Sequence, residues 1–337
     1  MIASIHKTVL LNETIEGLGL SRSQALGNSK SLASRKIVLD ATFGGGGHSI
    51  EILKRYPNAK IIALDQDKSV LRNLKDPRIS FYNLNFRDLD SINFLPKDFF
   101  ETAPSESRGQ GTHTFLKNPL AENYISAIIF DLGLSSDQLE NSGRGFSFMK
   151  DEPLLMTMKE NPLPEDLTAI DIVNTWGEKS LADIIYGYGE EKFSRRIARG
   201  IVEARVKNKI ETTWDLIKVI ENNVPIAYRK GHAKGRARRL HCATKTFQAL
   251  RIAVNDELGA LQTGLEKGFK VLNRGGRMAV ISFHSLEDRI VKRFYKEKQK
   301  KGEVILINKK PIIPKKEEIK NNPRSRSAKL RILEKII

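Results

Sequence analysis

The chain has 337 residues, of which 40% are hydrophobic, and it carries a formal net charge of +17 at neutral pH. This length favours two domains with real cores, whereas no apolar run is long enough for a membrane span and the N-terminus lacks the pattern of a signal peptide. The single cysteine, Cys242, excludes a disulfide framework and a cysteine-based zinc site. We therefore expect a cytoplasmic protein.

The positive charge is concentrated in two segments. Residues 229–240 hold six Lys and Arg and no acid, and residues 289–337 hold 17 Lys and Arg against five Asp and Glu, so the rest of the chain is close to neutral. This concentration predicts a polyanionic partner, most simply a nucleic acid, rather than charge that only keeps the protein in solution. Acidic membrane lipid fits less well, because neither segment has a strongly amphipathic helical pattern.

The first part of the chain alternates strands with helices. Short apolar runs predict four strands, at 37–43, 60–67, 79–86 and 124–130. Helical spacing predicts helices at 49–56 and 68–74. This alternation indicates an α/β fold with a doubly wound parallel sheet. Residues 97–123 interrupt it with a stretch rich in Ser, Gly, Thr and Pro, which we interpret as a surface insertion.

A helical domain is predicted in the middle of the chain. Apolar residues recur at helical spacing between residues 166 and 224, and no convincing strand lies among them. We expect residues 140–240 to form an inserted helical domain that recognises the substrate. Residues 1–139 and 241–337 then form the domain that holds the sheet.

The last third of the chain is expected to return to the sheet. A long helix is predicted over 243–272, followed by a fifth strand at 277–283. Ser285 with Asp288 predicts a capping box that opens a helix through Phe294. Two short apolar runs, at 304–307 and 329–333, are candidate final strands.

A glycine-rich loop follows the first predicted strand. Residues 40–49 read DATFGGGGHS, in which Asp40, Gly44 and Gly46 match the D-x-x-x-G-x-G loop of Rossmann-like methyltransferases. A P-loop is excluded because no Gly-Lys-Ser/Thr follows, and the dinucleotide fingerprint fits poorly because Ser49 stands where its third glycine belongs. An acid at the strand end suits a cationic ligand and would repel a pyrophosphate. A glycine turn that binds nothing is the alternative.

Three further residues lie at predicted strand ends, where open parallel sheets bind their ligands. Asp65 ends the second strand, where a carboxylate can accept both hydroxyls of an adenosine ribose. Its alternative role, a helix N-cap, could fall to Asp67 instead. Phe86 ends the third strand and either packs against an adenine face or belongs to the core. Asp131 ends the fourth, and together with Asp40 these residues indicate a ligand site at one edge of the sheet.

Eight segments, in order along most of the chain, resemble the bacterial 16S ribosomal RNA cytosine-N4 methyltransferase family. They are HKTVLLNETIEGL (6–18), DATFGGGGHS (40–49), DLGLSSDQL (131–139), RGFSF (144–148), YGEEKFSRRIARGIV (188–202), TKTFQALRIAVNDEL (244–258), ISFHSLEDRIVKRF (281–294) and NPRSRSAKLR (322–331). The segments ISFHSLEDRIVKRF and RGFSF are the most specific. On these motifs the chain is identified as a member of that family.

The resemblance implies a class I S-adenosylmethionine-dependent methyltransferase with a Rossmann-like fold and an inserted helical domain. It implies methyl transfer from S-adenosylmethionine, the cofactor, to the exocyclic N4 of a cytidine in the decoding region of 16S rRNA, with naked rRNA or the small ribosomal subunit as partner. By position, the cofactor-binding residues are Gly46, Gly47, His48, Asp65, Phe86, Asp131 and Gln138. Of these, His48 and Gln138 rest on the resemblance alone. Neither a metal ion nor a membrane partner is expected.

The chain also departs from the family pattern. Gly45 stands where the family usually has an arginine, and Cys242 stands where a proline is usual. Leu155 and Thr157 replace the Asp and the Arg of the usual segment P-L-D-M-R-M. The loss of both charges puts in doubt any role of residues 153–158 in RNA binding.

Methylation of an exocyclic amine is helped by a proton acceptor, because the nitrogen lone pair is delocalised into the ring and the amine is a poor nucleophile. The Asp/Asn/Ser-Pro-Pro-aromatic motif common in amino-methyltransferases is absent, and DLGLSS occupies its place. Asp131 is therefore the first candidate for a catalytic acceptor, followed by Ser135 and Ser136. Alternatively, Asp131 serves only the cofactor, and the serines form hydrogen bonds within a turn.

Candidate RNA-binding residues come from the basic segments and from two of the motifs. They are Arg144, Arg236, Arg238, Arg239, His284, Arg324 and Arg326. Arg144 could instead pair with a nearby acid, and His284 could cap local backbone. His241 is expected in the basic patch rather than as a catalytic base.

Two other functions compete with this reading. A cytosine-C5 methyltransferase needs a cysteine nucleophile, but Cys242 lies at a predicted helix start, away from the strand ends. A non-catalytic RNA-binding assembly factor that retains the fold would bind the cofactor without turnover. The intact glycine loop and Asp65 argue against this second alternative.

Overall fold

The computed structural model describes residues 8–21, 36–73, 76–92, 125–229 and 241–337. The predicted insertion at 97–123 lies outside these residues. Contacts within the chain define two compact units. The sheet unit comprises Lys7–Gln66, Val70–Gly133 and Gly259–Ile337, and the helical unit comprises Asp67–Ser69 and Leu134–Leu258, each within the described limits.

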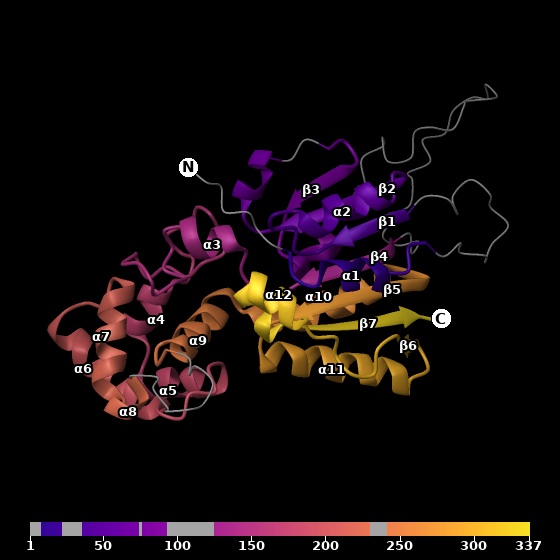
Figure 1. Cartoon of the computed structure of the whole chain (residues 1–337). Helices are drawn as coiled ribbons and strands as arrows, with labels where there is room; N and C mark the ends of the chain where they lie inside the picture. Colours follow the sequence, from indigo (N-terminus) through magenta and orange to yellow (C-terminus); the bar gives the residue numbers. More distant parts are fainter. Residues whose placement is uncertain (1–7, 22–35, 74–75, 93–124, 230–240) are drawn as a thin grey trace, which may run out of the picture. The chain divides into compact units, whose positions relative to one another are not determined.

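The sheet unit contains one seven-stranded sheet (Figure 1). Its strands are β1 (Lys36–Asp40), β2 (Ala59–Asp65), β3 (Ile79–Asn83), β4 (Ile125–Asp131), β5 (Leu272–Ser282), β6 (Val304–Leu306) and β7 (Lys329–Lys335). Their order is β3-β2-β1-β4-β5-β7-β6, in which the first five are parallel and β7 runs antiparallel to both of its neighbours. All the predicted strands are present, and the predicted α/β fold is confirmed.

Both faces of this sheet are buried, which explains why its strands are almost continuously apolar. Successive side chains of a strand point to opposite faces, so Leu39 packs with helices α10 (Glu257–Val271) and α11 (Ser285–Lys300), whereas Val38 packs with α1 (Leu11–Gly17) and α2 (Gly47–Arg55). A core therefore lies on each side of the sheet.

The strand order reverses between β1 and β4, which are neighbours although β2 and β3 lie between them in sequence. In open α/β sheets, ligands bind at the carboxyl ends of the strands at such a reversal. Asp40 and Asp131 are the last residues of these two strands, and Asp65 is the last residue of β2. The fold thus brings the three predicted acids to one edge of the sheet.

The helical unit is built from short helices around its own core. They are α3 (Ser136–Asn141), α4 (Ala169–Thr175), α5 (Glu178–Gly187), α6 (Ser194–Lys207), α7 (Thr213–Asn223), α8 (Ile226–Arg229) and α9 (Thr244–Asn255). Fully buried Ile172, Leu181, Ile197, Leu216 and Leu250 each come from a different one of them. The helical periodicity predicted between residues 166 and 224 is confirmed.

The long helix predicted over 243–272 is wrong, because the chain forms α9 and α10 with a break at Asp256. The backbone of Asp256 is left-handed, with φ 45°. Arg251 on α9 makes a bidentate pair with Glu257 on α10, with Nε–Oε1 and Nη2–Oε2 distances of 2.7 and 2.9 Å. This pair bridges the break.

The predicted capping box of Ser285 and Asp288 is also wrong, by one residue. His284 is the N-cap of α11, and Glu287 closes the box by accepting from the His284 backbone N–H. The helix continues beyond the predicted Phe294 to Lys300.

The remaining elements are short. Of the residues predicted as a helix at 68–74, Lys68–Asn73 form the 3-10 helix η1. The other short elements of the described residues are η2 (Phe86–Ser91), α12 (Lys316–Asn321) and η5 (Pro323–Ser327). Among the described residues, no helix combines the length and the apolar character needed to cross a membrane.

Candidate active site

The glycine-rich loop connects β1 to α2 and needs its glycines for steric reasons. Gly44 and Gly46 have left-handed backbones, with φ 49° and 71°, and Gly46 is the N-cap of α2. A Cβ on Gly46 would come within 2.7 Å of the Phe43 ring, and one on Gly47 would overlap the Thr8 hydroxyl. The glycines are therefore required because Phe43 and Thr8 pack directly against the backbone of this loop.

Asp40 holds this loop and the first turn of α2. Its carboxylate is buried and accepts hydrogen bonds from the Ser49 hydroxyl at 2.6 Å and from the Thr42 backbone N–H at 3.3 Å. Burial raises the pKa of Asp40 to about 6, and the nearby charge of Asp65 adds to this rise, against the two hydrogen bonds. Asp40 thus connects the end of β1 to the loop and to the first turn of α2.

Asp65 connects the end of β2 to the same loop. One of its carboxylate oxygens, Oδ2, accepts the backbone N–H of Gly44 at 2.7 Å. Its backbone carbonyl accepts the side-chain amide of Asn83, which ends β3. The carboxylate lies at the position that the sequence predicted for ribose binding, and its hydrogen bond fixes the glycine loop relative to β2.

Asp131 is the last residue of β4 at the same edge. Its backbone N–H donates to the Thr42 hydroxyl at 2.6 Å, and its Oδ2 lies 3.6 Å from Nδ1 of the buried His48. The other oxygen, Oδ1, is buried and has no hydrogen-bond partner among the described residues. Burial, with repulsion from Asp40 and Glu287, raises the pKa of Asp131 to about 8.

The predicted position of Phe86 at a strand end is wrong, because β3 ends at Asn83 and Phe86 is the first residue of η2. Its ring meets the ring of Phe130 edge to face, with centroids 5.5 Å apart. A Cβ on Gly264 of α10 would strike this ring, so the glycine makes room for it. The core role that the sequence left open is the one observed, and contact with an adenine stays a prediction.

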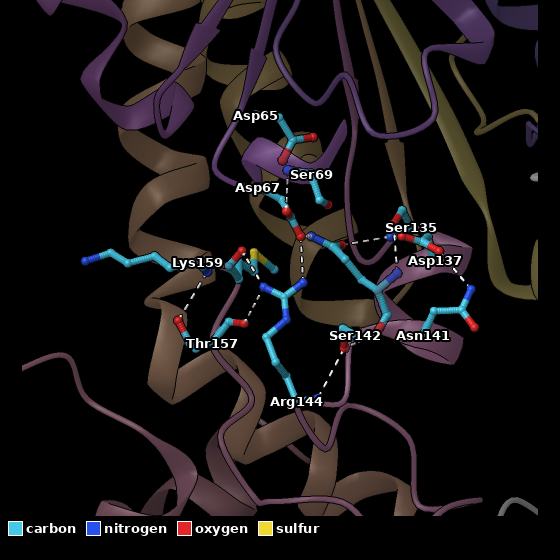
Figure 2. Close-up of polar contacts among 12 residues, drawn as sticks. Asp65, Asp67, Ser69, Ser135, Asp137, Asn141, Ser142, Arg144, Thr157 and Lys159 are labelled. Carbon is cyan, nitrogen blue, oxygen red and sulfur yellow. Dashed lines mark hydrogen bonds and ion pairs between the residues drawn. The ribbon is translucent and has the colours of Figure 1, made fainter. Parts of the chain in front are cut away.

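Gln138 and Arg144 both donate to one buried carboxylate of the helical unit, that of Asp67. Figure 2 shows Arg144 pointing at Asp67. Arg144 Nη2 lies 2.6 Å from Asp67 Oδ2, with only 8% and 1% of the two side chains exposed. The side-chain amide of Gln138 donates to the same oxygen at 3.4 Å, and the Ser69 backbone N–H donates to Oδ1. Gln138 also forms a capping box with Ser135, in which its side-chain oxygen accepts the Ser135 backbone N–H. Its side chain is therefore held by both Ser135 and Asp67.

Arg144 is committed to this cluster rather than to solvent. Its Nη1 donates to the carbonyls of Thr157 and Met158, at 3.2 and 2.9 Å. Burial by itself would raise the pKa of Asp67, but hydrogen bonds from Ser69 and Arg144 outweigh it and hold that pKa below its usual value. Of the two roles expected for Arg144, pairing with a nearby acid is therefore the one observed.

The other predicted RNA-binding residues have different settings. His284 accepts the Glu287 backbone N–H at Nδ1 and lies 3.1 Å from its carboxylate, so the capping role expected as an alternative is observed, and contact with RNA stays a prediction. Arg324 and Arg326 are exposed on η5. The three arginines Arg236, Arg238 and Arg239 lie outside the described residues.

Three further predictions concern Cys242, His241 and Ser135. Cys242 is buried in the core of the helical unit, and burial raises the pKa of its thiol, which disfavours a thiolate nucleophile. His241 stacks on Phe148, with ring centroids 4.8 Å apart. Ser135 accepts the Gln138 backbone N–H, so the turn role proposed for it as an alternative is observed.

The sequence reasoning missed Thr42 and Ser49 and gave Asp67 only a capping role. Thr42 and Ser49 flank the glycines inside the quoted motif DATFGGGGHS, so the motif itself carried the signal. Their hydroxyls hold Asp131 and Asp40, respectively. The ion pair of Asp67 has no local signal, because its partner stands 77 residues away.

Comparison with known proteins points to one family. The profile of the MraW methylase family matches residues 3–336. Proteins named ribosomal RNA small subunit methyltransferase H are similar over nearly the whole chain. They include those of Persephonella marina (41% identity, covering 96% of this chain and 100% of the relative) and Synechococcus elongatus (44%, 98% and 95%). The Clostridium botulinum protein of the same name is 39% identical, covering 98% of this chain and 99% of its own.

Proposed function

The chain belongs to the MraW methylase family of S-adenosylmethionine-dependent methyltransferases, and from this premise we propose that it methylates the exocyclic N4 of a cytidine in the decoding region of 16S rRNA. The family that the sequence motifs indicated is thereby confirmed. Within it, the observation that carries the proposal is Asp131, a buried acid at the end of β4 with one oxygen that no described residue engages.

The residues present suit the cofactor. The glycine-rich loop follows β1 at the carboxyl ends of the strands, and Asp65 stands where a ribose is bound in related sheets. Together with His48, Phe86, Asp131 and Gln138, these are the residues proposed to hold S-adenosylmethionine. When bound, the cofactor supplies an electrophilic methyl group on a positively charged sulfur.

Asp131 is proposed to accept hydrogen from the target amine. The lone pair of N4 is delocalised into the cytosine ring, and an acceptor on its hydrogens favours the pyramidal nitrogen that can attack. Oδ1 of Asp131 is buried and accepts no hydrogen bond from another described residue, so this contact would displace none. The pKa of the Asp131 carboxyl is raised to about 8. A positive charge nearby, such as that on the sulfur of the bound cofactor, would lower this pKa and favour the ionised carboxylate, which can accept a proton.

The rRNA has to present an unstacked cytidine to this edge of the sheet, because a stacked base cannot reach the methyl group. We assign recognition of the RNA to the inserted helical domain, predicted as residues 140–240, and to the basic segments at 229–240 and 289–337. Their Lys and Arg side chains would bind phosphates, and Arg324 and Arg326, which are exposed, are proposed to be among them.

The proposal is tested by tritiated methyl transfer from S-adenosylmethionine to unmodified 16S rRNA and to assembled small subunits, followed by mass spectrometry of the digested RNA. N4-methylcytidine is the expected product. Finding 5-methylcytidine, together with an inactive Cys242→Ala enzyme, would overturn the mechanism. Stoichiometric cofactor binding with no turnover on either substrate would instead support a non-catalytic assembly factor.

The role of Asp131 is tested by measuring cofactor affinity and turnover separately in Asp131→Ala. Severe loss of turnover is expected. Normal affinity with slow chemistry identifies Asp131 as the acceptor, whereas lost affinity assigns it to the cofactor. Turnover close to that of the wild type would refute both roles.

A further inference from the structure

The motif YGEEKFSRRIARGIV, at residues 188–202, has no part in the strand-end site. Its fourth residue is Glu191, which is fully buried. One carboxylate oxygen accepts the backbone N–H of Phe193 at 2.9 Å, and the other accepts the hydroxyl of Tyr228 at 2.6 Å. The rings of Phe193 and Tyr228 also meet edge to face, with centroids 4.9 Å apart. Glu191 therefore ties the start of α6 to α8.

The turn before α6 is fastened to α9 as well. A Cβ on Gly189 would overlap the backbone carbonyl oxygen of Lys245, so only glycine allows this approach. The Lys245 ammonium donates to the carbonyl of Glu190 at 2.6 Å, and the Gln248 amide donates to the carbonyl of Tyr188 at 2.9 Å. The N-terminal end of α6 is thus held firmly in the helical unit.

The solvent-exposed side of α6 is basic near this end of the helix. Ile197 and Ile201 are buried in the core, whereas the side chains of Arg195, Arg196 and Arg199 are exposed. Arg199 Nε lies 3.7 Å from the exposed carboxylate of Glu178, a surface pair of small energetic value. The side chains of Arg195 and Arg196 make no ion pair or hydrogen bond with another described residue.

The stability of α6 does not explain this placement. A helix carries partial positive charge at its N-terminus, so arginines in the first turn are unfavourable there. Arg195 and Arg196 occupy that turn, which contains no acid, and the helix has no side-chain N-cap. The nearest acid in sequence, Glu191, is buried and already accepts two hydrogen bonds. A negatively charged partner outside the protein would offset the cost.

We propose that Arg195, Arg196 and Arg199 form a phosphate-binding surface for the RNA substrate. The inference rests on the proposed function and adds a contact surface to it. Guanidinium groups bind phosphate oxygens in bidentate fashion, and these three project from about one turn of an anchored helix. Glu191 also links α6 to Tyr228 of α8, the helix that ends at Arg229.

The test compares two triple variants with the same change in charge. The first is Arg195→Gln, Arg196→Gln and Arg199→Gln. The control is Lys207→Gln, Lys209→Gln and Lys218→Gln, which neutralises three exposed lysines elsewhere in the helical unit. For each full-length protein, Kd for unmodified 16S rRNA is measured across a range of salt concentrations, alongside Kd for S-adenosylmethionine and the melting temperature.

The arginine variant should weaken RNA binding by about 10-fold at moderate salt and reduce the slope of log Kd against log salt by about 2–2.7, since each lost phosphate contact removes about 0.7–0.9. The control should change both quantities far less, and cofactor affinity should stay the same in both. Equal slopes for the two variants would overturn the inference. That result is distinct from failure of the proposed function, in which the wild-type protein binds rRNA without methylating it.

Discussion

Replacing Arg144 with methionine should strongly destabilise the helical unit. Methionine keeps much of the length and apolar volume of the side chain but removes the guanidinium, which lies 2.6 Å from Asp67 Oδ2 (Figure 2). Asp67, only 1% exposed, would keep its charge without its main partner. The carbonyls of Thr157 and Met158 would lose their donor as well.

The expected loss is about 3–5 kcal/mol of unfolding free energy, the usual cost of removing one partner of a buried ion pair. The two lost hydrogen bonds to carbonyls are not added in full, because contacts that share one side chain are not independent. Such a loss is a large part of the about 5–15 kcal/mol that stabilises an ordinary domain. Converting Asp67 to asparagine in the same protein should recover part of it, since the stranded charge is then gone.

Urea unfolding followed by tryptophan fluorescence measures the stability of the helical unit. The chain has two tryptophans, Trp176 and Trp214, and both belong to the helical unit. The reasoning is refuted if Arg144→Met costs less than about 1 kcal/mol, or if the costs of the Arg144 and Asp67 changes simply add. In the wild type the pKa of Asp67 is held low, so its contribution is present above the ordinary pKa near 3.8 and disappears as the pH falls through the native pKa.

Three further predictions concern the strand-end site. Asp65→Ala should weaken S-adenosylmethionine by about 1.5–3 kcal/mol, the usual value of a hydrogen bond to a charged group, and unchanged affinity in calorimetry would rule out ribose binding by this residue. Gly47→Ala should destabilise the sheet unit by about 1–3 kcal/mol, because the new methyl overlaps the Thr8 hydroxyl; thermal melts should show partial recovery in a Gly47→Ala/Thr8→Ala protein, and a wild-type melting temperature for Gly47→Ala would contradict the clash. Asp131→Asn should flatten the pH dependence of stability between about pH 4 and 8, because the pKa of Asp131 is raised to about 8 and the native state keeps a proton there that the unfolded chain has lost. Wild-type stability then falls as the pH rises through this window, and parallel urea titrations of the two proteins would contradict the assignment.

The sequence by itself determined the sheet and the edge at which its acids meet. Strands buried on both faces have to be continuously apolar, so β1, β2 and β4 stand out from the chain, and the acid that ends each of them marks where the apolar run stops. The glycines of the loop were predictable for a related reason, since only glycine accepts the left-handed backbone at Gly44 and Gly46 without strain.

Local patterns were less reliable where competing side chains decide the outcome. The break at Asp256 has no proline or glycine to announce it, and an amphipathic pattern continues across it. The N-cap of α11 is His284 rather than the serine that follows it, because Glu287 accepts the His284 backbone N–H and its own N–H reaches the His284 ring. Phe86 was misplaced because an apolar residue just beyond a strand continues the same pattern.

Only the tertiary structure decided which charged residues are held inside the protein and which face solvent. Arg144 and Arg195 are the same kind of residue, each in a quoted motif, yet Arg144 is buried against Asp67 and Arg195 is exposed on α6. The difference arises from a carboxylate 77 residues away from Arg144, which folding brings within 2.6 Å. A sequence records the charge of an arginine but not its burial, and burial determines whether that charge stabilises the fold or remains available to a phosphate.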